Sequence, residues 1–452
     1  MENRTIPTFI INREKRTDRK EHIIKEFQGR DEFDTTIITA LEHEIGAVGL
    51  WNSIQHILTN KVSDDDDYIL ICEDDHQFTA HYSKEKLFSA IEEAAKLKAD
   101  VLVGGISWLD STLPVSEGIF WVRAFTGTQF LIVFKSFFSK VLEATFCPDR
   151  AIISNAVTSG DLERSNFVGF KLCSLTDRKY LLYPFISIQK DFGYSDVTGE
   201  TAVGIVEALF DAAKDKVETT LRILSFYKGH PLPTVDSKLD AETIIPTYII
   251  NLPERTERRE HILNEFKDKN EFSINLIDAY KHKIGAVGLW MTMRKIIGMA
   301  IANNDDFVLI IEDDHVFTEH YSKQYLFDNI AKARMLGANI LSGGAGYFGL
   351  AVPVTQNTYW INPSGCTQFT IIFKKFFQKI LDAPYDDTIM ADMFLSEMTS
   401  NRMVIYPYIS VQKDFGYSDA TSLHNMVSVS TVFNYCSRRL ADIHRVRPMC
   451  NA

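Results

Sequence analysis

The chain has 452 residues, 45% of them hydrophobic and 24% charged, and no apolar run is long enough to span a bilayer. Its formal net charge of -12 excludes an overall basic footprint for nucleic acid or for an anionic membrane surface. The length predicts two or three domains, and without a secretory leader we expect a cytoplasmic protein, for which peripheral membrane association stays open.

The predicted elements at the start of the chain alternate between short apolar strands and longer amphipathic helices. In chain order they are a strand at 8–12, a helix at 17–28, a strand at 35–39, a helix at 47–59, a strand at 68–72, a helix at 83–97 and a strand at 100–103. This order predicts an α/β fold with a mostly parallel central sheet flanked by helices. Sheets of this class bind ligands beyond the carboxyl ends of their strands.

The sequence then repeats itself. The run Ile6–Asn12 (IPTFIIN) returns as Ile245–Asn251 (IPTYIIN), an offset of 239 residues, and IGAVGLW, EDDH and TQF return at the same offset. The run QKDFGYSD at 189–196 returns at 412–419, an offset of 223, so the second copy is 16 residues shorter before it. A period this long predicts two duplicated Rossmann-related domains rather than a solenoid of small repeats.

A domain boundary is predicted after the helical pattern at 201–229, which the run GHPLP at 229–233 interrupts. We assign a first domain to 1–230, a linker to 231–243 and a second domain to 244–452. The second copy of the helix is expected at 421–445.

A basic turn follows the first strand of each copy and opens the next helix. Thr17 and Thr256 are the expected N-caps. Cations in a first helical turn oppose the helix dipole, so a bound anion would account for them. The candidates for contacting phosphates or the nucleotide are Asn12, Arg16, Arg19, Asn251, Arg255 and Arg258. The alternative is that these cations point into solvent.

Three adjacent acids follow the predicted central strand of each copy. Acids crowded at the end of a buried strand destabilise the fold unless a cation neutralises them, and oxygen ligands suit Mn²⁺ or Mg²⁺. The predicted metal ligands are Glu73, Asp74, Asp75, Glu312, Asp313 and Asp314. In an extended chain the outer two acids face one side, so they are the first choice. A solvated acidic turn is the alternative. We expect His76 and His315 to support the acids or pack in the core, and direct contact with the substrate is the alternative.

Further shared residues have two interpretations each. Lys190 and Lys413, in the two QKDFGYSD runs, contact phosphate or belong to a structural corner. Gln129 and Gln368 precede apolar strands and either line the donor pocket or begin a core strand. The pairs Gly104-Gly105 and Gly343-Gly344 allow close approach of a sugar, or form tight turns.

Taken together, these motifs resemble glycosyltransferase family 25. The residues that carry the resemblance are a strand ending in Ile-Asn, the run RTERR at 255–259, a Gly-x-x-Gly helix start and the strand ending in Glu-Asp-Asp. That family includes bacterial lipopolysaccharide β-galactosyltransferases and collagen galactosyltransferases. The resemblance implies a GT-A-like fold, a UDP-sugar donor, a Mn²⁺-type ion at the acidic triplet and inversion at the sugar carbon.

The resemblance also implies a catalytic base. The family's usual Pro-x-Asp-x-x-Leu segment is similar to residues 390–395 here, which makes Asp392 the candidate base. The first copy has Gly169 at the equivalent position, so it is either inactive or uses Asp161 or Glu163 instead. We therefore expect transfer of a hexose, typically galactose, to a glycan or glycolipid acceptor in surface polysaccharide synthesis.

Two other functions compete with this prediction. A nucleotidyltransferase would use the same metal and acids, although no Gly-rich, Lys-bearing phosphate loop follows the first strand. A non-catalytic carbohydrate-binding protein is the second alternative, for one half or both.

Overall fold

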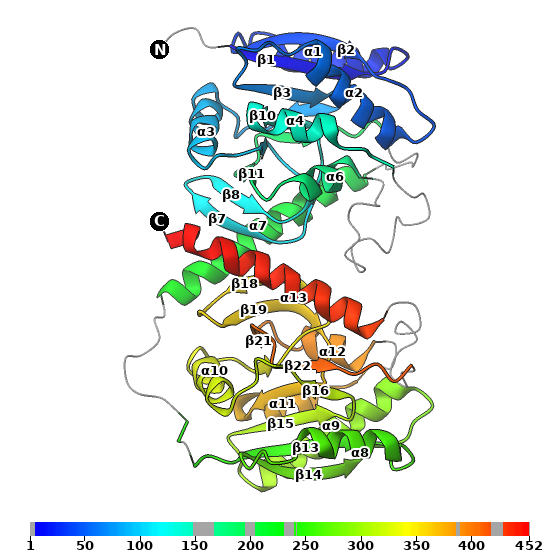
Figure 1. Cartoon of the computed structure of the whole chain (residues 1–452), viewed down its shortest axis with the longest axis vertical. Helices are drawn as coiled ribbons and strands as arrows, with labels where there is room; N and C mark the ends of the chain where they lie inside the picture. The colour runs from blue at the N-terminus through cyan, green and yellow to red at the C-terminus, as the bar shows by residue number, and fades with distance from the viewer. Residues whose placement is uncertain are drawn as a thin grey trace. The chain divides into compact units, whose positions relative to one another are not determined.

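A computed structural model describes residues 5–147, 167–194, 204–229, 239–240, 242–385, 389–416 and 428–451 (Figure 1). The chain divides into two compact units. Unit 1 comprises residues 1–221 together with 445–452, and unit 2 comprises residues 222–444. The linker assigned to 231–243, and the acids Asp161 and Glu163, lie largely or wholly outside the described residues.

Unit 1 contains an alternating series of strands and helices. Its strands are β1 (Ile6–Asn12), β2 (Phe33–Thr39), β3 (Tyr68–Glu73), β4 (His76–Phe78), β5 (Val101–Val103), β6 (Trp108–Leu109), β7 (Thr112–Ser116), β8 (Ile119–Val122), β9 (Phe125–Thr126), β10 (Phe130–Phe134), β11 (Lys179–Leu182) and β12 (Ser187–Gln189). Its helices are α1 (Thr17–Phe27), α2 (Gly46–Asn60), α3 (Lys84–Lys96), α4 (Lys135–Glu143), α6 (Val168–Leu175) and most of α7 (Ile205–Gly229).

Unit 2 repeats this series. Its strands are β13 (Ile245–Asn251), β14 (Phe272–Asp278), β15 (Phe307–Glu312), β16 (His315–Phe317), β17 (Ile340–Ser342), β18 (Tyr347–Pro353), β19 (Thr358–Gly365), β20 (Phe369–Phe373), β21 (Arg402–Ile405) and β22 (Ser410–Gln412). Its helices are α8 (Thr256–Glu265), α9 (Gly285–Ala302), α10 (Lys323–Met335), the 3-10 turn η3 (Lys374–Phe376), α11 (Phe377–Asp382), α12 (Ala391–Glu397) and most of α13 (Val429–Val446). The 3-10 turn η5 (Arg447–Asn451) belongs to unit 1.

The two central sheets have the same topology. The strand order is β2-β1-β3-β10-β5-β11-β8-β7 in unit 1 and β14-β13-β15-β20-β17-β21-β19-β18 in unit 2. In unit 1 the pairings run parallel for β1 with β2 and β3 and for β5 with β11, while β10 and β8 run opposite to their neighbours. Six of the eight strands therefore share one direction, which confirms the mostly parallel sheet.

Helices cover both faces of the sheet, as the pattern of buried residues in unit 2 demonstrates. Ile249 of β13 packs in a cluster with residues of α8 and α10. Its neighbour Ile250 packs in a second cluster with residues of α9, α11 and α12. Successive side chains of a strand point to opposite faces, so two apolar layers enclose the sheet. This confirms the α/β class with helix-flanked sheets.

The predicted strands and helices of the first copy are all present within one to two residues of their expected ends. Among the described residues, the helix expected at 421–445 corresponds to α13. The predicted N-caps were wrong, because Thr17 and Thr256 are the first helical residues and Arg16 and Arg255 occupy the cap positions without a side-chain cap bond. Within the described part of the chain, no helix has the length and apolar character needed to cross a membrane.

Candidate functional site

The site residues meet at the carboxyl edge of each sheet. Strands β1 and β3 are parallel neighbours, with Ile11 paired to Glu73, so Asn12 and the acids that follow Glu73 leave the sheet side by side. Strands β13 and β15 have the same register, with Ile250 paired to Glu312. The sheet topology thus brings together the basic turn and the acidic triplet, which are distant in the sequence.

The middle acid of each triplet is neutralised by groups from the basic turn. In unit 1, Asp74 accepts a hydrogen bond from Asn12 Nδ2 at 2.8 Å and an ion pair from Arg19 Nη1 at 3.0 Å. In unit 2, Asn251 Nδ2 lies 2.8 Å from Asp313 and Arg258 Nη1 lies 3.1 Å from it. These bonds fix the turn after the first strand against the acids. The middle acids and the two arginines therefore form structural ion pairs.

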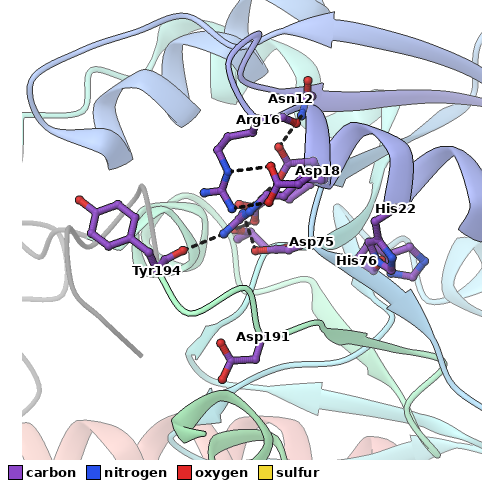
Figure 2. A network of polar contacts seen from close by, with 12 residues as sticks. Asn12, Arg16, Asp18, His22, Asp75, His76, Asp191 and Tyr194 are labelled. Carbon is purple, nitrogen blue, oxygen red and sulfur yellow. Dashed lines mark hydrogen bonds and ion pairs between the residues drawn. The ribbon is translucent and has the colours of Figure 1, made fainter. Parts of the chain in front are cut away.

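Arg16 and Arg255 lie at the N-cap of the following helix. Arg16 donates from Nε and Nη2 to the carboxylate of Asp18, each at 3.2 Å (Figure 2). This pairing is the main cause that lowers the pKa of Asp18. An acid in the first helical turn also interacts favourably with the helix dipole. Asp18 therefore neutralises part of the positive charge of the basic turn in unit 1.

The outer acids of unit 1 have fewer partners, and Asp75 shares Arg19 with Asp74. Glu73 accepts a hydrogen bond from Thr128 at 2.6 Å, and Asp75 lies 3.1 Å from Arg19 Nη1. Burial is the first cause that raises the pKa of Glu73, and the charge of Asp75 is the second. Burial also raises the pKa of Asp75, against the opposing effect of Arg19. The two outer carboxylates therefore repel each other in a largely buried place.

The outer acids of unit 2 are less well neutralised. Arg258 Nη1 is 3.9 Å from Asp314, and Asp313 raises the pKa of Asp314 more than Arg258 lowers it, after the larger effect of burial. Burial raises the pKa of Glu312 to about 8, with Asp314 as the next cause, and the Asp392 carboxylate adds a smaller contribution. Negative charge at this edge of unit 2 is therefore in excess.

The described residues contain no group of three His, Cys, Asp or Glu side chains arranged to hold a metal ion. The predicted triplets thus do not form a three-ligand site. Magnesium-type ions, however, commonly take only one or two protein carboxylates and complete their shell with water and phosphate oxygens. Glu312 and Asp314 fit such an ion by their chemistry, since they are oxygen donors whose charges repel.

Lys190 and Lys413 reach the same place from the QKDFGYSD runs. The backbone N–H of Lys190 donates to Asp75 O at 2.7 Å, and that of Lys413 donates to Asp314 O at 2.8 Å. The run's phenylalanine gathers cations in both units, with Arg19 and Lys190 over Phe192 and their equivalents over Phe415. These runs therefore place further positive charge beside the acids.

His76 and Gln129 lie in the core below the acids. His76 is fully buried, its Nδ1 lies 2.8 Å from Ser187 Oγ, and phenylalanine rings surround it. Burial lowers its pKa well below the usual value, and that of His315 to about 3. Gln129, also fully buried, donates to Gly105 O at 3.0 Å, and Gln368 is equivalent. The histidines pack as expected, and both glutamines occupy core positions.

The double glycines have a packing reason. A Cβ on Gly105 would lie 1.9 Å from Ser187 O, and one on Gly344 would lie 2.1 Å from Ser410 O. A side chain at either position would collide with the neighbouring backbone. These glycines therefore let two segments of main chain approach each other.

Asp392, the candidate base, lies in the first turn of α12. Its Oδ2 accepts a hydrogen bond from the Cys366 N–H at 2.9 Å. Its negative charge contributes to the raised pKa of Glu312, after burial and the charges of Asp314 and Asp313. Unit 2 therefore brings a third carboxylate toward the outer acids from a different part of the chain.

Unit 1 has no room for such a group. A Cβ on Gly169 would lie 2.5 Å from Phe125 O and 3.2 Å from Thr126 Cα. Helix α6 thus rests directly on the backbone of β9. The equivalent position is closed in unit 1 and occupied by a carboxylate in unit 2.

This contact predicts that Gly169→Ala destabilises the protein by about 1–3 kcal/mol, because the new methyl group displaces rigid backbone. Gly298→Ala is the matched control: this glycine lies within α9 with nothing near its Cβ position, so alanine is expected to stabilise by about 0.5–1 kcal/mol. Urea denaturation of both variants measures the difference. Equal stability of the two variants would show that α6 is not packed as described.

Comparisons with known proteins add little to this geometry. The chain matches no protein-family model and no curated protein. Among solved structures, A197 from STIV is 14% identical over 39% of this chain and 87% of its own, with a TM-score of 0.28. UDP-glucose pyrophosphorylase, as the apo protein and complexed with UDP-glucose, is 10% and 9% identical over 44% of this chain and 81% of its own, with TM-scores of 0.26. TM-scores this low support no inference about activity.

Sequence reasoning missed Cys366 and Arg402, which surround Asp392. Cys366 has a φ of 77°, unusual for a residue with a side chain. Arg402 is buried, with 1% of its surface exposed. A signal was present in the sequence, because the first copy has Gly127 and Lys179 at these positions. A residue that differs between two otherwise similar copies is a candidate for a function that only one copy has.

Proposed function

We propose that the protein is a metal-dependent glycosyltransferase that moves a hexose from a UDP-sugar to an acceptor hydroxyl, with unit 2 performing the transfer. Galactose as the hexose, Mn²⁺ or Mg²⁺ as the metal and a surface glycan or lipopolysaccharide as the acceptor follow from the resemblance to family 25. A GT-A-like arrangement of each unit belongs to the same proposal.

One observation carries the proposal. In unit 2, the carboxylates of Glu312 and Asp314 lie together at the carboxyl edge of the sheet, where burial raises the pKa of both, and the charge of Asp392 makes a smaller contribution to the raised pKa of Glu312. Excess buried negative charge destabilises a protein unless a ligand compensates it. A divalent cation and a sugar donor are ligands of the required kind.

Each group then has a role. Glu312 and Asp314 would hold the cation, which when bound stabilises negative charge on the departing diphosphate. Arg258 and Lys413 lie over Phe415 beside these acids, placed to attract the diphosphate. Asp392 would take the proton from the attacking hydroxyl, which makes the oxygen a better nucleophile.

Unit 1 supports a different role. It keeps the basic turn, the acids and the QKDFGYSD run, but backbone closes the position of the base at Gly169. We propose that this unit binds a nucleotide sugar or glycan without transferring sugar. The non-catalytic alternative thus applies to one half of the chain.

The proposal is tested on the full chain with a panel of nucleotide sugars. We expect Mn²⁺-dependent release of UDP from one UDP-hexose, and thermal stabilisation by that donor that EDTA abolishes. Release of pyrophosphate from UTP and a sugar phosphate would indicate the nucleotidyltransferase instead. Binding without release of any nucleotide would leave only the carbohydrate-binding function.

A further inference from the structure

The surroundings of Asp392 differ between the units as a set. The residues in question in unit 2 are Ser364, Gly365, Cys366, Asp392, Ser396 and Arg402, and their counterparts in unit 1 are Phe125, Thr126, Gly127, Gly169, Cys173 and Lys179. The neighbouring acids, Thr128 and Thr367, and the QKDFGYSD runs are identical in the two copies. Next to these unchanged groups, the network around Asp392 therefore differs at all six positions.

In unit 2 this network joins the end of β19 to helix α12. The Ser364 N–H donates to Ser396 Oγ at 3.0 Å. The Cys366 N–H donates to Asp392 Oδ2 at 2.9 Å. Together with the core packing of Ala391 and Leu395, these bonds fix where the first turn of α12, and hence Asp392, lies.

Cys366 has a strained backbone conformation within this network. Its positive φ is strained for a residue with a Cβ, and it turns the N–H to the Asp392 carboxylate. A Cβ on Gly346 would lie 2.7 Å from Cys366 Sγ, so a side chain at one position excludes one at the other. Unit 1 has the opposite pair, Ser107 and Gly127. The two positions have changed together.

Arg402 lies behind this network. Its Nη1 donates to Ser364 O and to Asp392 O, each at 3.3 Å, so one guanidinium group spans the strand and the helix. Its Nε and Nη2 bond to no atom of the described residues. Burial lowers the pKa of Arg402 to about 10, and the attraction of Asp392 opposes that effect. The charge of Asp392 therefore offsets part of the cost of burying this cation.

The equivalent cation of unit 1, Lys179, makes different contacts. Lys179 Nζ donates to Cys173 O at 3.2 Å and to Thr176 O, both at the end of α6. Neither acceptor belongs to the strand on which α6 rests. Lys179 thus caps a helix, whereas Arg402 joins a strand and a helix through their backbone carbonyls.

Resting on the proposed function, we propose that Arg402 is a positioning residue for transfer: through its hydrogen bonds to Ser364 O and Asp392 O it holds the start of α12 against the end of β19. It does not touch the donor. Its effect on the reaction passes through the position and charge of Asp392.

The test compares Arg402→Met and Arg402→Lys with the matched control Lys179→Met, all in the full chain. Misplacing a reacting group by about 1 Å costs about 10²-fold in rate, so Arg402→Met is expected to lower kcat by about 10- to 100-fold with KM for the UDP-sugar nearly unchanged. Arg402→Lys restores part of kcat, because it keeps the charge. Lys179→Met is expected to lower the denaturation midpoint without lowering kcat.

A double-mutant cycle separates positioning from mere folding. If Arg402 acts through Asp392, adding Arg402→Met to Asp392→Asn produces little further loss of kcat. The proposal would be overturned if the losses of kcat in the two single variants were additive, or if kcat were unchanged in Arg402→Met. It would also be overturned if Arg402→Met lost the thermal stabilisation by the donor along with kcat. If the wild-type protein transfers sugar from no nucleotide donor, the proposed function fails first, and this inference falls with it before any variant is compared.

Discussion

Asp392→Asn is expected to lower the rate of sugar transfer by about 10²- to 10⁴-fold, the usual contribution of a general base. Asparagine has the shape of aspartate and keeps the hydrogen bond from the Cys366 N–H, while the one from the Met393 N–H is lost. The core packing of Ala391 and Leu395 keeps α12 in place. It cannot accept the proton of the acceptor hydroxyl. The variant should therefore bind the UDP-sugar with unchanged affinity, as titration calorimetry in the presence of Mn²⁺ would measure.

The control for this variant lies on the same helix. Glu397 is exposed near the end of α12, and Glu397→Gln removes one negative charge there without altering the network around Asp392. Its rate should match the wild type. A normal rate in Asp392→Asn would remove Asp392 as the base. If both Asp392→Asn and Glu397→Gln are slow, the loss of rate comes from the changed net charge of α12 rather than from the loss of a base.

The fold was predictable because its signals are local and repeated. Apolar strands such as Tyr68–Glu73 alternate with amphipathic helices, and the same order occurs twice, so each copy supports the assignment of the other. The N-caps were missed because Thr17 is a favoured cap residue by type, while the backbone turn places Arg16 at the cap. Residue preference at a helix start is a weaker signal than hydrophobic periodicity.

The site was predictable only in part. Parallel strands end at one edge, so the meeting of Asn12 with the acids after Glu73 follows from the element order. The sequence could not show that Arg19 pairs with Asp74, because two nearby cations and three acids allow several pairings. It also could not show the role of Arg402, since a basic residue at a strand start is ordinarily exposed and only the packing of α12 and β19 buries it.

The double variant Glu312→Gln with Asp314→Asn should abolish Mn²⁺-dependent stabilisation and reduce transfer by at least about 10²-fold. Both changes keep the shape of the side chains, and glutamine still accepts the hydrogen bond that Thr367 donates to Glu312. What they remove is the buried repulsion that raises the pKa of both groups. The metal-free variant should therefore be more stable than the metal-free wild type.

The middle acid of the same triplet provides a control of opposite sign. Asp313 pairs with Arg258 and accepts from Asn251, so Asp313→Asn leaves a largely buried guanidinium with only the 3.9 Å contact to Asp314 and should cost about 3–5 kcal/mol. Urea denaturation with EDTA, near pH 9 where the outer acids are ionised, compares the two variants. If both variants lose stability, or if Mn²⁺ still stabilises the double variant, the excess charge of Glu312 and Asp314 does not serve to bind a cation. If the double variant is more stable than the wild type and Asp313→Asn is less stable, then Asp313 stabilises the fold, whereas Glu312 and Asp314 destabilise it until a cation binds.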